Sequence, residues 1–224
     1  GYTDVIDADL SGYFDSIPHA ELMQSVARRI SDRHVLALIK QWLVAAVEEE
    51  DGRGPRIRTT RAKDSKRGIP QGAPISPLLS NLYMRRFLLG WKTSGLEARL
   101  QARIVNYADD FVICCRGTGE QAMAAMRAMM DRLKLTVNEE KTGRCRIPQA
   151  HFDFLGYTFG RCYSTQTGRA YIGTRPSKKS IRKVCRTMIS EATSRRWLLK
   201  DSEDRVEALN RVLVGWANYF SLGP

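Results

Sequence analysis

The chain has 224 residues, of which 43% are hydrophobic and 27% charged, a composition typical of folded globular proteins and not of disordered ones. Lys and Arg outnumber Asp and Glu by 36 to 24, and the net charge of +12 favours a polyanionic partner. No apolar run of about 18 residues could span a bilayer, and the first residues lack the basic and apolar blocks of a signal peptide. We therefore expect nucleic acid as the partner, and no membrane.

The cysteines form an odd set of five without a Cys-x-x-Cys pair. With only three histidines to help them, they do not resemble the closely spaced ligands of a zinc site. We expect reduced, structural thiols in a cytosolic compartment, with a regulatory thiol as the alternative. The residues are Cys114, Cys115, Cys145, Cys162 and Cys185.

Residues 3–10 alternate apolar and polar side chains, which predicts a strand that ends in acidic residues. A helix is expected after Ser16-Ile17-Pro18, because Pro is tolerated in the first turn. Ser31-Asp32 can cap the next helix, whose apolar stripe runs from Val35 to Leu43. The chain therefore opens as a strand followed by two helices.

Residues 53–67 contain seven basic residues and one acid, which predicts an exposed hairpin or loop leading into Gly68-Ile69-Pro70-Gln71-Gly72. Ser76-Pro77 then provides an N-cap followed by Pro at the first helical position. The helix that starts there is expected to continue through Leu88.

Tyr107-Ala108-Asp109-Asp110 lies between two short apolar runs, residues 103–106 and 111–115, which predict a hairpin with the acidic pair at its turn. Adjacent carboxylates repel each other, and that repulsion has to be offset by cations or hydrogen bonds. An ordinary acidic turn is the alternative, because Asp is common in turns.

The remainder of the chain changes character near Thr174. A helix over about 120–133 has a Met-rich face typical of core filling, and residues 152–174 place aromatic residues between glycines, as in hairpins. Residues 175–200 hold nine basic residues and one acid, and a last helix is expected over about 203–220. We predict a mixed α+β part followed by a basic helical part.

Asp9 ends a predicted strand, and Asp109 lies at a hairpin tip 100 positions later. If both strands join one sheet, the two carboxylates can converge on a pair of divalent cations, of the kind that activates a hydroxyl and stabilises a leaving oxygen in phosphoryl transfer. Mg²⁺ is the expected ion, because it prefers carboxylate and phosphate oxygens.

The order of these motifs resembles that of reverse transcriptase–maturase proteins encoded by bacterial group II introns. The matching segments are residues 9–15, 68–72 with 76–79, 107–110, 138–142, 154–157 and, in the last helix, 215–220. The resemblance implies an α+β reverse transcriptase palm, an antiparallel sheet backed by helices with primer-grip hairpins, over residues 1–174. It implies a basic helical thumb, called domain X in maturases, over residues 175–224.

By this resemblance, Asp9 and Asp109 are the principal ligands of two Mg²⁺ ions, Asp110 completes the acidic cluster, and the backbone carbonyl of Leu10 adds a ligand. Phe14 would lie under the nucleotide sugar and exclude a 2′-hydroxyl by clash. An ordinary core position is the alternative for Phe14.

The same resemblance assigns nucleotide-site roles to Pro70, Gln71 and Gly72, with Gln71 contacting the incoming nucleotide or the template and Gly72 allowing a close backbone approach. A plain turn is the alternative. Lys141 would lie near the triphosphate, where it could neutralise charge or protonate the departing pyrophosphate, unless it is simply a solvated lysine. We interpret Asp7 and Asp15 as supporting or capping groups.

Two further sets concern primer and RNA. The turn Phe154-Leu155-Gly156 would grip the primer strand. A basic face of the first thumb helix would follow RNA phosphates, which makes binding steeply salt-dependent; a solvated charged face is the alternative. Its residues are Lys178, Lys179, Arg182 and Lys183.

The implied function is RNA-directed DNA synthesis in the bacterial cytoplasm from an RNA template, a DNA primer and deoxynucleoside triphosphates, combined with binding of intron RNA. The alternatives are an RNA-binding splicing maturase without polymerase activity, or a reverse transcriptase of a retron or CRISPR-associated system. Because Asp9 comes so early, we expect a palm-and-thumb fragment without fingers. Such a fragment would have an intact acidic site and weak or no autonomous activity, since positioning supplies most of the catalysis.

Overall fold

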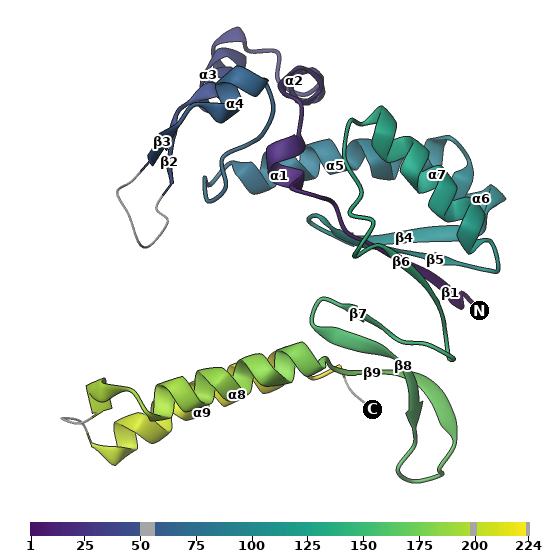
Figure 1. The fold of residues 1–224 in the computed structure, drawn as a ribbon, viewed down its shortest axis with the longest axis vertical. Coiled ribbons are helices and arrows are strands. Elements are labelled where there is room, and N and C mark those ends of the chain that lie inside the picture. Colours follow the sequence, from purple (N-terminus) through teal and green to yellow (C-terminus); the bar gives the residue numbers. More distant parts are fainter. Residues whose placement is uncertain (50–56, 198–200, 223–224) are drawn as a thin grey trace. The chain divides into compact units, whose positions relative to one another are not determined.

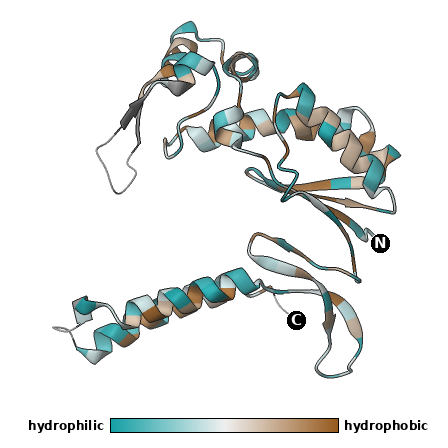
Figure 2. Ribbon diagram, in the orientation of Figure 1, coloured by the Kyte–Doolittle hydropathy of each residue, from teal (hydrophilic) through white to brown (hydrophobic). Residues whose placement is uncertain are grey.

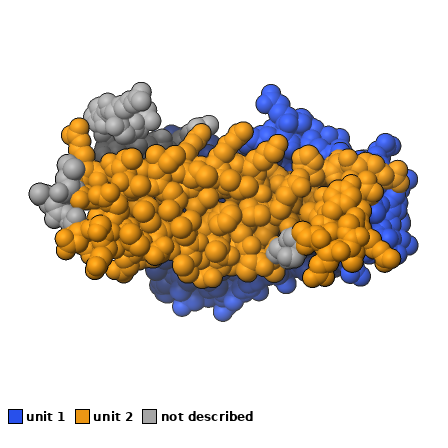
Figure 3. Space-filling model, turned by 90° about the horizontal axis from the view of Figure 1, so that it is seen from below, with its two compact units in different colours: residues 1–144 blue, residues 145–224 orange. Residues whose placement is uncertain are grey.

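The computed structural model describes residues 1–49, 57–197 and 201–222. The chain divides into two compact units, Gly1–Arg144 and Cys145–Pro224, which are coloured separately in Figure 3. Each unit is described by itself below. In the described ranges, no helix combines the length and the hydropathy that crossing a lipid bilayer requires.

An antiparallel sheet forms the centre of the first unit, with strand order β4-β5-β1-β6 (Figure 1). The central strand β5 pairs with β1 on one side and with β4 on the other. The predicted first strand and the predicted acidic hairpin are both confirmed, whereas β6, a polar segment, was not predicted. The strands are β1 (Asp4–Ala8), β4 (Ala102–Tyr107), β5 (Asp110–Cys115) and β6 (Gly143–Arg146).

The described part of the first unit has seven helices; the long helices α5 and α7 cover one face of this sheet, and α3 and α4 lie away from it beside the β2–β3 strands (Figure 1). The two predicted helices after β1 are confirmed as α2 and α3. The short helices α1, α4 and α6 were not predicted. The helices are α1 (Tyr13–Ser16), α2 (His19–Ala27), α3 (Arg33–Val44), α4 (Arg61–Ser65), α5 (Ser76–Thr93), α6 (Leu96–Arg99) and α7 (Gly119–Arg132).

The helix starts follow from local chemistry. The carboxylate of Asp32 accepts hydrogen bonds from the backbone amides of His34 and Val35, so it caps α3 as predicted. The prediction for α5 was wrong by one residue. Ser76 is already helical, and its hydroxyl donates to the carbonyl of Pro70 instead of capping the helix.

A two-stranded hairpin of β2 (Val47–Glu49) and β3 (Ile57–Thr59) precedes α4. The hairpin or loop predicted for the basic segment 53–67 is confirmed only in part, because β3 belongs to this hairpin whereas Arg61–Ser65 form helix α4. Arg53 and Arg56 of that segment lie outside the described residues.

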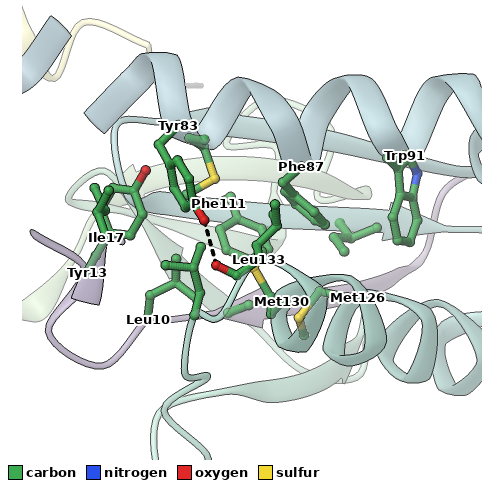
Figure 4. Packing of buried hydrophobic residues seen from close by; sticks show 14 of the residues in the cluster. Leu10, Tyr13, Ile17, Tyr83, Phe87, Trp91, Phe111, Met126, Met130 and Leu133 are labelled. Atoms are coloured by element: carbon green, nitrogen blue, oxygen red, sulfur yellow. Dashed lines mark hydrogen bonds between the residues drawn. The ribbon is translucent and has the colours of Figure 1, made fainter. Parts of the chain in front are cut away.

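The hydrophobic core of the first unit lies between the sheet and helices α5 and α7 (Figure 4). The rings of Phe87 and Phe111 have centroids 5.3 Å apart, and Met126 and Met130 are fully buried, which confirms the Met-rich face as core. The buried hydroxyl of Tyr83 donates to the carbonyl of Leu133 at 2.7 Å. Each such large side chain contributes about 1.5–3 kcal/mol by its burial, so this core makes a firm base for the sheet.

The second unit combines a three-stranded sheet, in the order β7-β8-β9, with two long helices. Figure 2 shows hydrophilic and hydrophobic residues interspersed along both helices. The predicted hairpins and the predicted helical end are confirmed. The elements are β7 (Phe152–Phe154), β8 (Tyr157–Tyr163), β9 (Ala170–Pro176), α8 (Lys178–Ala192), a 3₁₀ turn (Arg195–Trp197) and α9 (Ser202–Tyr219).

The division into compact units differs from the predicted domains, which meet after residue 174. The reason lies in the β7–β8 turn, because the carbonyl of Gly156 accepts hydrogen bonds from the amide of Ser177 and the hydroxyl of Ser180, at 2.8 and 3.0 Å. The hydroxyl of Tyr157 also donates to the carbonyl of Tyr219. The hairpins therefore pack with the helices that follow them. Assignment of residues 1–174 and 175–224 to palm and thumb stays a prediction.

Candidate active site

The acidic hairpin turn is a two-residue connection. Tyr107 pairs with Asp110 across β4 and β5, so Ala108 and Asp109 form the turn. Ala108 has a φ of 53°, a left-handed conformation that costs a non-glycine residue about 1–2 kcal/mol. Backbone strain of this kind is common at functional sites, and here it occurs in the turn that places Asp109 at the tip of the hairpin.

Asp9 follows β1 directly and comes to the same end of the sheet. In the β1–β5 register, Ala8 lies opposite Phe111, so the next pair of positions is Asp9 and Asp110. Leu10 is buried and forms a bridge with Val137.

The loop 138–142 holds Asp9 in place. The side-chain amide of Asn138 donates to Oδ2 of Asp9 at 3.2 Å, and Nζ of Lys141 lies 3.4 Å from the same oxygen. The backbone amide of Asp9 donates to Oγ1 of Thr142 at 3.2 Å. Lys141 thus places a cation at the carboxylate, although its side chain is 69% exposed and that of Asp9 35%.

Sequence reasoning gave a role to Lys141 but missed Asn138 and Thr142. Both lie in the same five-residue segment, and their short polar side chains are the signal that could have identified them. Asn and Thr are suited to local hydrogen bonds with a neighbouring backbone or carboxylate.

Tyr13 in α1 connects the acidic turn with the core. Its hydroxyl is buried and donates to the carbonyl of Ser80 at 2.7 Å. Burial raises the pKa of Tyr13 strongly, with further contributions from the neighbouring Tyr83 and from the negative charge of Asp109. The charge of Asp109 therefore acts on α1, so the hairpin turn and the segment after Asp9 are electrostatic neighbours. Tyr13 was not among the predicted site residues.

Phe14 is half-buried, packs against the core and meets the ring of Tyr13 edge-on, with centroids 5.8 Å apart. Its backbone carbonyl accepts a hydrogen bond from the amide of Ile69 at 2.8 Å. Gly68 has a φ of +93°, and a Cβ there would lie 3.2 Å from the carbonyl oxygen of Asp15. Glycine is therefore required where this segment crosses α1.

The residues after Ile69 are placed by the same contacts. Pro70 is half-buried, and its carbonyl accepts a hydrogen bond from the hydroxyl of Ser76. Gln71 and Gly72 are exposed, and a Cβ at Gly72 would meet nothing within 4 Å. Of the predicted nucleotide-site residues, Phe14 and Pro70 are thus tied together through Ile69, while Gln71 and Gly72 follow as an exposed turn.

The carboxylates at this end of the sheet are the candidate metal ligands. Over residues 1–49, 57–197 and 201–222, no group of three or more His, Cys, Asp or Glu side chains is arranged so as to hold a metal ion. The acidic set of Asp9, Asp109 and Asp110 is therefore not a closed protein cage. Its carboxylate oxygens still fit Mg²⁺ in kind, because that ion is commonly held by one or two carboxylates together with waters and substrate phosphates.

The predicted primer-grip turn lies in the second unit. Leu155 and Gly156 connect β7 to β8 with φ values of 50° and 81°, as a tight two-residue hairpin turn requires. The hydroxyl of Tyr219 in α9 donates to the carbonyl of Leu155 at 2.9 Å. The turn is thus held from behind by the last helix.

The predicted basic face is the exposed first half of α8. Ser177 caps the helix by accepting the amide of Ser180. Lys178 and Lys179 occupy the first turn, where positive charge opposes the helix dipole. Within the described part of the chain, none of the four predicted cations of this helix forms an ion pair with a carboxylate. They are Lys178, Lys179, Arg182 and Lys183.

All five cysteines are free thiols; Cys115 is buried as a structural thiol would be, whereas Cys185 is exposed. Burial raises the pKa of Cys115 to about 11, with smaller contributions from Cys114 and Asp4. That thiol is protonated and unreactive near neutral pH.

Comparison with known proteins identifies the family. Residues 1–159 match the family model described as reverse transcriptase (RNA-dependent DNA polymerase), and residues 182–224 match the group II intron maturase-specific domain. Among curated proteins, the chain is similar to Protein YkfC of Escherichia coli (strain K12), with 32% identity over 209 residues that cover 79% of this chain and 52% of that protein.

Group II intron-encoded protein LtrA of Lactococcus lactis subsp. cremoris shows 23% identity over 213 residues, covering 68% of this chain and 34% of LtrA. The chain spans about half the length, or less, of these relatives.

Among solved structures, telomerase from Candida tropicalis in complex with a TWJ fragment of telomeric RNA has a TM-score of 0.54 at 13% identity. The match covers 96% of this chain and 38% of that one. Telomerase from Candida albicans in the corresponding complex has a TM-score of 0.55 at 13% identity, covering 97% and 39%. These likenesses confirm the predicted α+β reverse transcriptase fold. The family match over residues 1–159 and the maturase match that follows show that this chain belongs to the reverse transcriptase family, in its group II intron maturase branch.

Proposed function

We propose that the protein is an RNA-directed DNA polymerase of a group II intron that also binds intron RNA as a maturase. The observation that carries this proposal is the acidic end of the sheet. There Asp9, held by Asn138, Thr142 and Lys141, comes to the same strand ends as the hairpin turn with Asp109. Membership of the reverse transcriptase family supports it.

Members of this family use divalent metal ions, and we propose two Mg²⁺ ions held by Asp9, Asp109 and Asp110, with the carbonyl of Leu10 as a further ligand. When bound, such ions activate the primer hydroxyl and stabilise the leaving pyrophosphate oxygen. Asn138 and Thr142 orient Asp9 for this role. Lys141, already at the carboxylate, is free to pivot on its exposed stem and neutralise triphosphate charge.

The remaining residues position the nucleotide and the primer. Phe14, wedged between Tyr13 and the Ile69 segment, would exclude a ribose 2′-hydroxyl by clash. Gln71 and Gly72 form an exposed turn next to it that can approach the incoming nucleotide or the template. In the second unit, the rigid turn of Phe154, Leu155 and Gly156 would grip the primer.

The intron RNA contact is proposed for α8. Lysines in the first turn of a helix are repelled by the positive end of the helix dipole. Those of α8 have no carboxylate partner in the described ranges. A bound phosphate would offset both the unfavourable dipole interaction and the unpaired positive charge. The template, the DNA primer and the deoxynucleoside triphosphates complete the set of partners.

The test is single-turnover primer extension on an RNA template with Mg²⁺ and deoxynucleotides, at saturating primer–template, with the wild-type protein and each variant joined to a reverse transcriptase fingers segment. Asp109→Ala should lower the rate by about 10³-fold or more, because several kcal/mol of transition-state stabilisation are lost. Its affinity for RNA should stay within about twofold, since a single charge is a small part of a polyelectrolyte contact. Asp131→Ala, an exposed Asp on α7, is the matched control and should leave both quantities unchanged.

A reciprocal variant separates the two activities. Lys178→Gln/Lys179→Gln should weaken RNA binding and its salt dependence while leaving the saturated extension rate unchanged. Wild-type protein that binds RNA but never extends a primer would leave only the maturase role. A large loss of RNA affinity in Asp109→Ala would contradict the separation of the two sites.

A further inference from the structure

A second concentration of positive charge lies in the first unit, between helices α2 and α5, away from every candidate site residue. A cavity of about 380 Å³ is lined by four arginines and flanked by two leucines. We call it the arginine pocket; its lining consists of Ser25, Arg28, Arg29, Leu82, Arg85, Arg86 and Leu89.

Helical spacing explains how the two helices build this pocket. Arg28 and Arg29 stand at the C-terminal end of α2, and Leu82, Arg85, Arg86 and Leu89 share one face of α5, at positions i, i+3, i+4 and i+7. The core face of α5, with Tyr83 and Phe87, points elsewhere (Figure 4). The pocket is therefore an exterior groove on a helix that is anchored in the core.

Two of the four guanidinium groups are fixed by the protein. Nη1 of Arg29 donates to the carbonyl of Ser25 at 2.8 Å, and Nη1 of Arg86 donates to the carbonyl of Glu21 at 3.2 Å. Arg86 also lies over the ring of Tyr83, 5.4 Å from its centroid. These contacts hold the groups in place, and the acceptors are neutral carbonyls; the charge of Arg86 also makes a small contribution to lowering the pKa of Glu21.

The other two, Arg28 and Arg85, are exposed and make no hydrogen bond or ion pair with any described residue. The nearby Glu21 is no counter-ion for them, since its carboxylate bonds Lys134 at 2.5 Å. Within residues 1–49, 57–197 and 201–222, none of the four arginines pairs with a carboxylate.

The helix dipole accounts for the two arginines of α2 but not for the two of α5. Positive charge at the C-terminal end of α2 is favoured by the helix dipole. Arg85 and Arg86, however, lie in the middle of α5, where the helix dipole does not offset the repulsion from the other arginines that line the pocket. An anion in the groove would remove that repulsion.

Guanidinium chemistry selects the anion. The planar fork of Arg matches two phosphate oxygens and stays charged at all physiological pH values. The flanking Leu82 and Leu89 offer apolar surface for the face of a sugar. We propose that the arginine pocket binds the sugar–phosphate backbone of RNA, as a contact separate from the active site and from α8. This inference rests on the proposed function only in taking RNA as the polyanion.

The experiment measures binding of a labelled single-stranded RNA by fluorescence anisotropy over a series of salt concentrations. Arg28→Gln/Arg85→Gln removes the two groups without structural contacts. Loss of two phosphate contacts should reduce the slope of log affinity against log salt by about 1.4 and the affinity by about tenfold. Arg28→Lys/Arg85→Lys should keep the slope and recover part of the affinity.

Arg99→Gln/Arg132→Gln is the matched control, because both arginines are exposed and stand near the ends of α6 and α7. It should bind RNA like the wild type. Thermal unfolding of each variant confirms that it folds, and the extension rate at saturating primer–template should be unchanged in all of them.

The inference is overturned if Arg28→Gln/Arg85→Gln keeps the wild-type salt slope, or if the control loses as much affinity. It is also overturned if only the binding of poly-glutamate, used as a second probe, depends on the pocket, since that assigns it to an acidic protein. In each case wild-type extension and its loss in Asp109→Ala leave the proposed function standing. Wild-type protein that neither binds RNA nor extends a primer overturns both.

Discussion

The two compact units bury their side chains in different ways. In the first unit, α5 and α7 press large residues such as Phe87 and Met130 completely out of solvent against the sheet. In the second unit, neither α8 nor α9 has a single described residue that is buried. The acidic end of the sheet therefore lies on a rigid base, whereas the residues of α8 and α9 that the structure describes are all half-buried or exposed.

The second unit owes its order to a small cluster where the last helix meets the β7–β8 turn. The ring of Tyr157 lies 4.8 Å from that of Phe220, and Phe220 lies 4.8 Å from Trp216, centroid to centroid. Hydrogen bonds from Ser177 and Ser180 to the Gly156 carbonyl complete it. A few ring contacts and hydrogen bonds thus hold the elements of the second unit together, whereas a continuous hydrophobic core does so in the first.

The largest expected effect tests the core of the first unit. Phe87→Ala should lower the free energy of unfolding by about 3–5 kcal/mol, because it removes a fully buried ring and leaves a cavity. Its counterpart Ile189→Ala, on a side chain that is 64% exposed in α8, should change it by less than about 0.5 kcal/mol. Urea denaturation measures both, and hydrogen exchange assigns the loss to a unit. Equal losses in the two variants would contradict the contrast between the units.

Sequence patterns predicted β4, β5 and the acidic turn between them, because short apolar runs on both sides of Tyr107–Asp110 are typical of a hairpin. They also predicted α3, whose cap Asp32 acts locally. The four-residue α1 and the polar β6 carry no periodicity long enough to read, and both are set by tertiary contacts.

The site residues that the sequence patterns did not predict have partners that are distant in the sequence. Asn138 bonds Asp9 across 129 positions, and the fully buried Asp4 pairs with Arg144 across 140. The arginine pocket likewise needs α2 and α5 to lie together, since each arginine pair alone looks like an ordinary exposed helix face. Such contacts depend on the fold and not on local spacing.

The next effect tests the cluster of the second unit. A Cβ at Gly156 would lie 2.9 Å from the Ser180 hydroxyl and 3.4 Å from the Phe220 ring, at a φ of +81°. Gly156→Ala should cost about 1–3 kcal/mol by crowding, in addition to about 1 kcal/mol for the positive φ. Gly168→Ala has a similar φ of +66° but nothing within 4 Å, so it should show only the smaller cost. Thermal unfolding compares the two, and equal destabilisation would show that the turn is not held by the helices.

The smallest expected effect on stability compares one ion pair in the first unit with one in the second. Glu21 and Lys134 join α2 to the residues after α7 at 2.5 Å, whereas Glu207 and Arg211 at 3.0 Å belong to one turn of α9. The hydrogen bond from Lys134 holds the pKa of Glu21 below its usual value of 4.5. The folded state therefore binds this proton less readily than the unfolded state, so the pair stabilises the protein above pH 4.5 and loses its effect as the pH falls below that value.

Glu21→Gln should accordingly lower the free energy of unfolding at neutral pH by less than about 1 kcal/mol, and the difference from wild type should vanish well below pH 4.5. Glu207→Gln serves as the control and should change stability less at every pH, because both partners are exposed and already adjacent in one helix. Urea midpoints measured across the acid range give both differences. If the loss of unfolding free energy in Glu21→Gln persists or grows in acid, the glutamate stabilises the protein through packing. The ion pair with Lys134 would then not be what links α2 to the residues after α7.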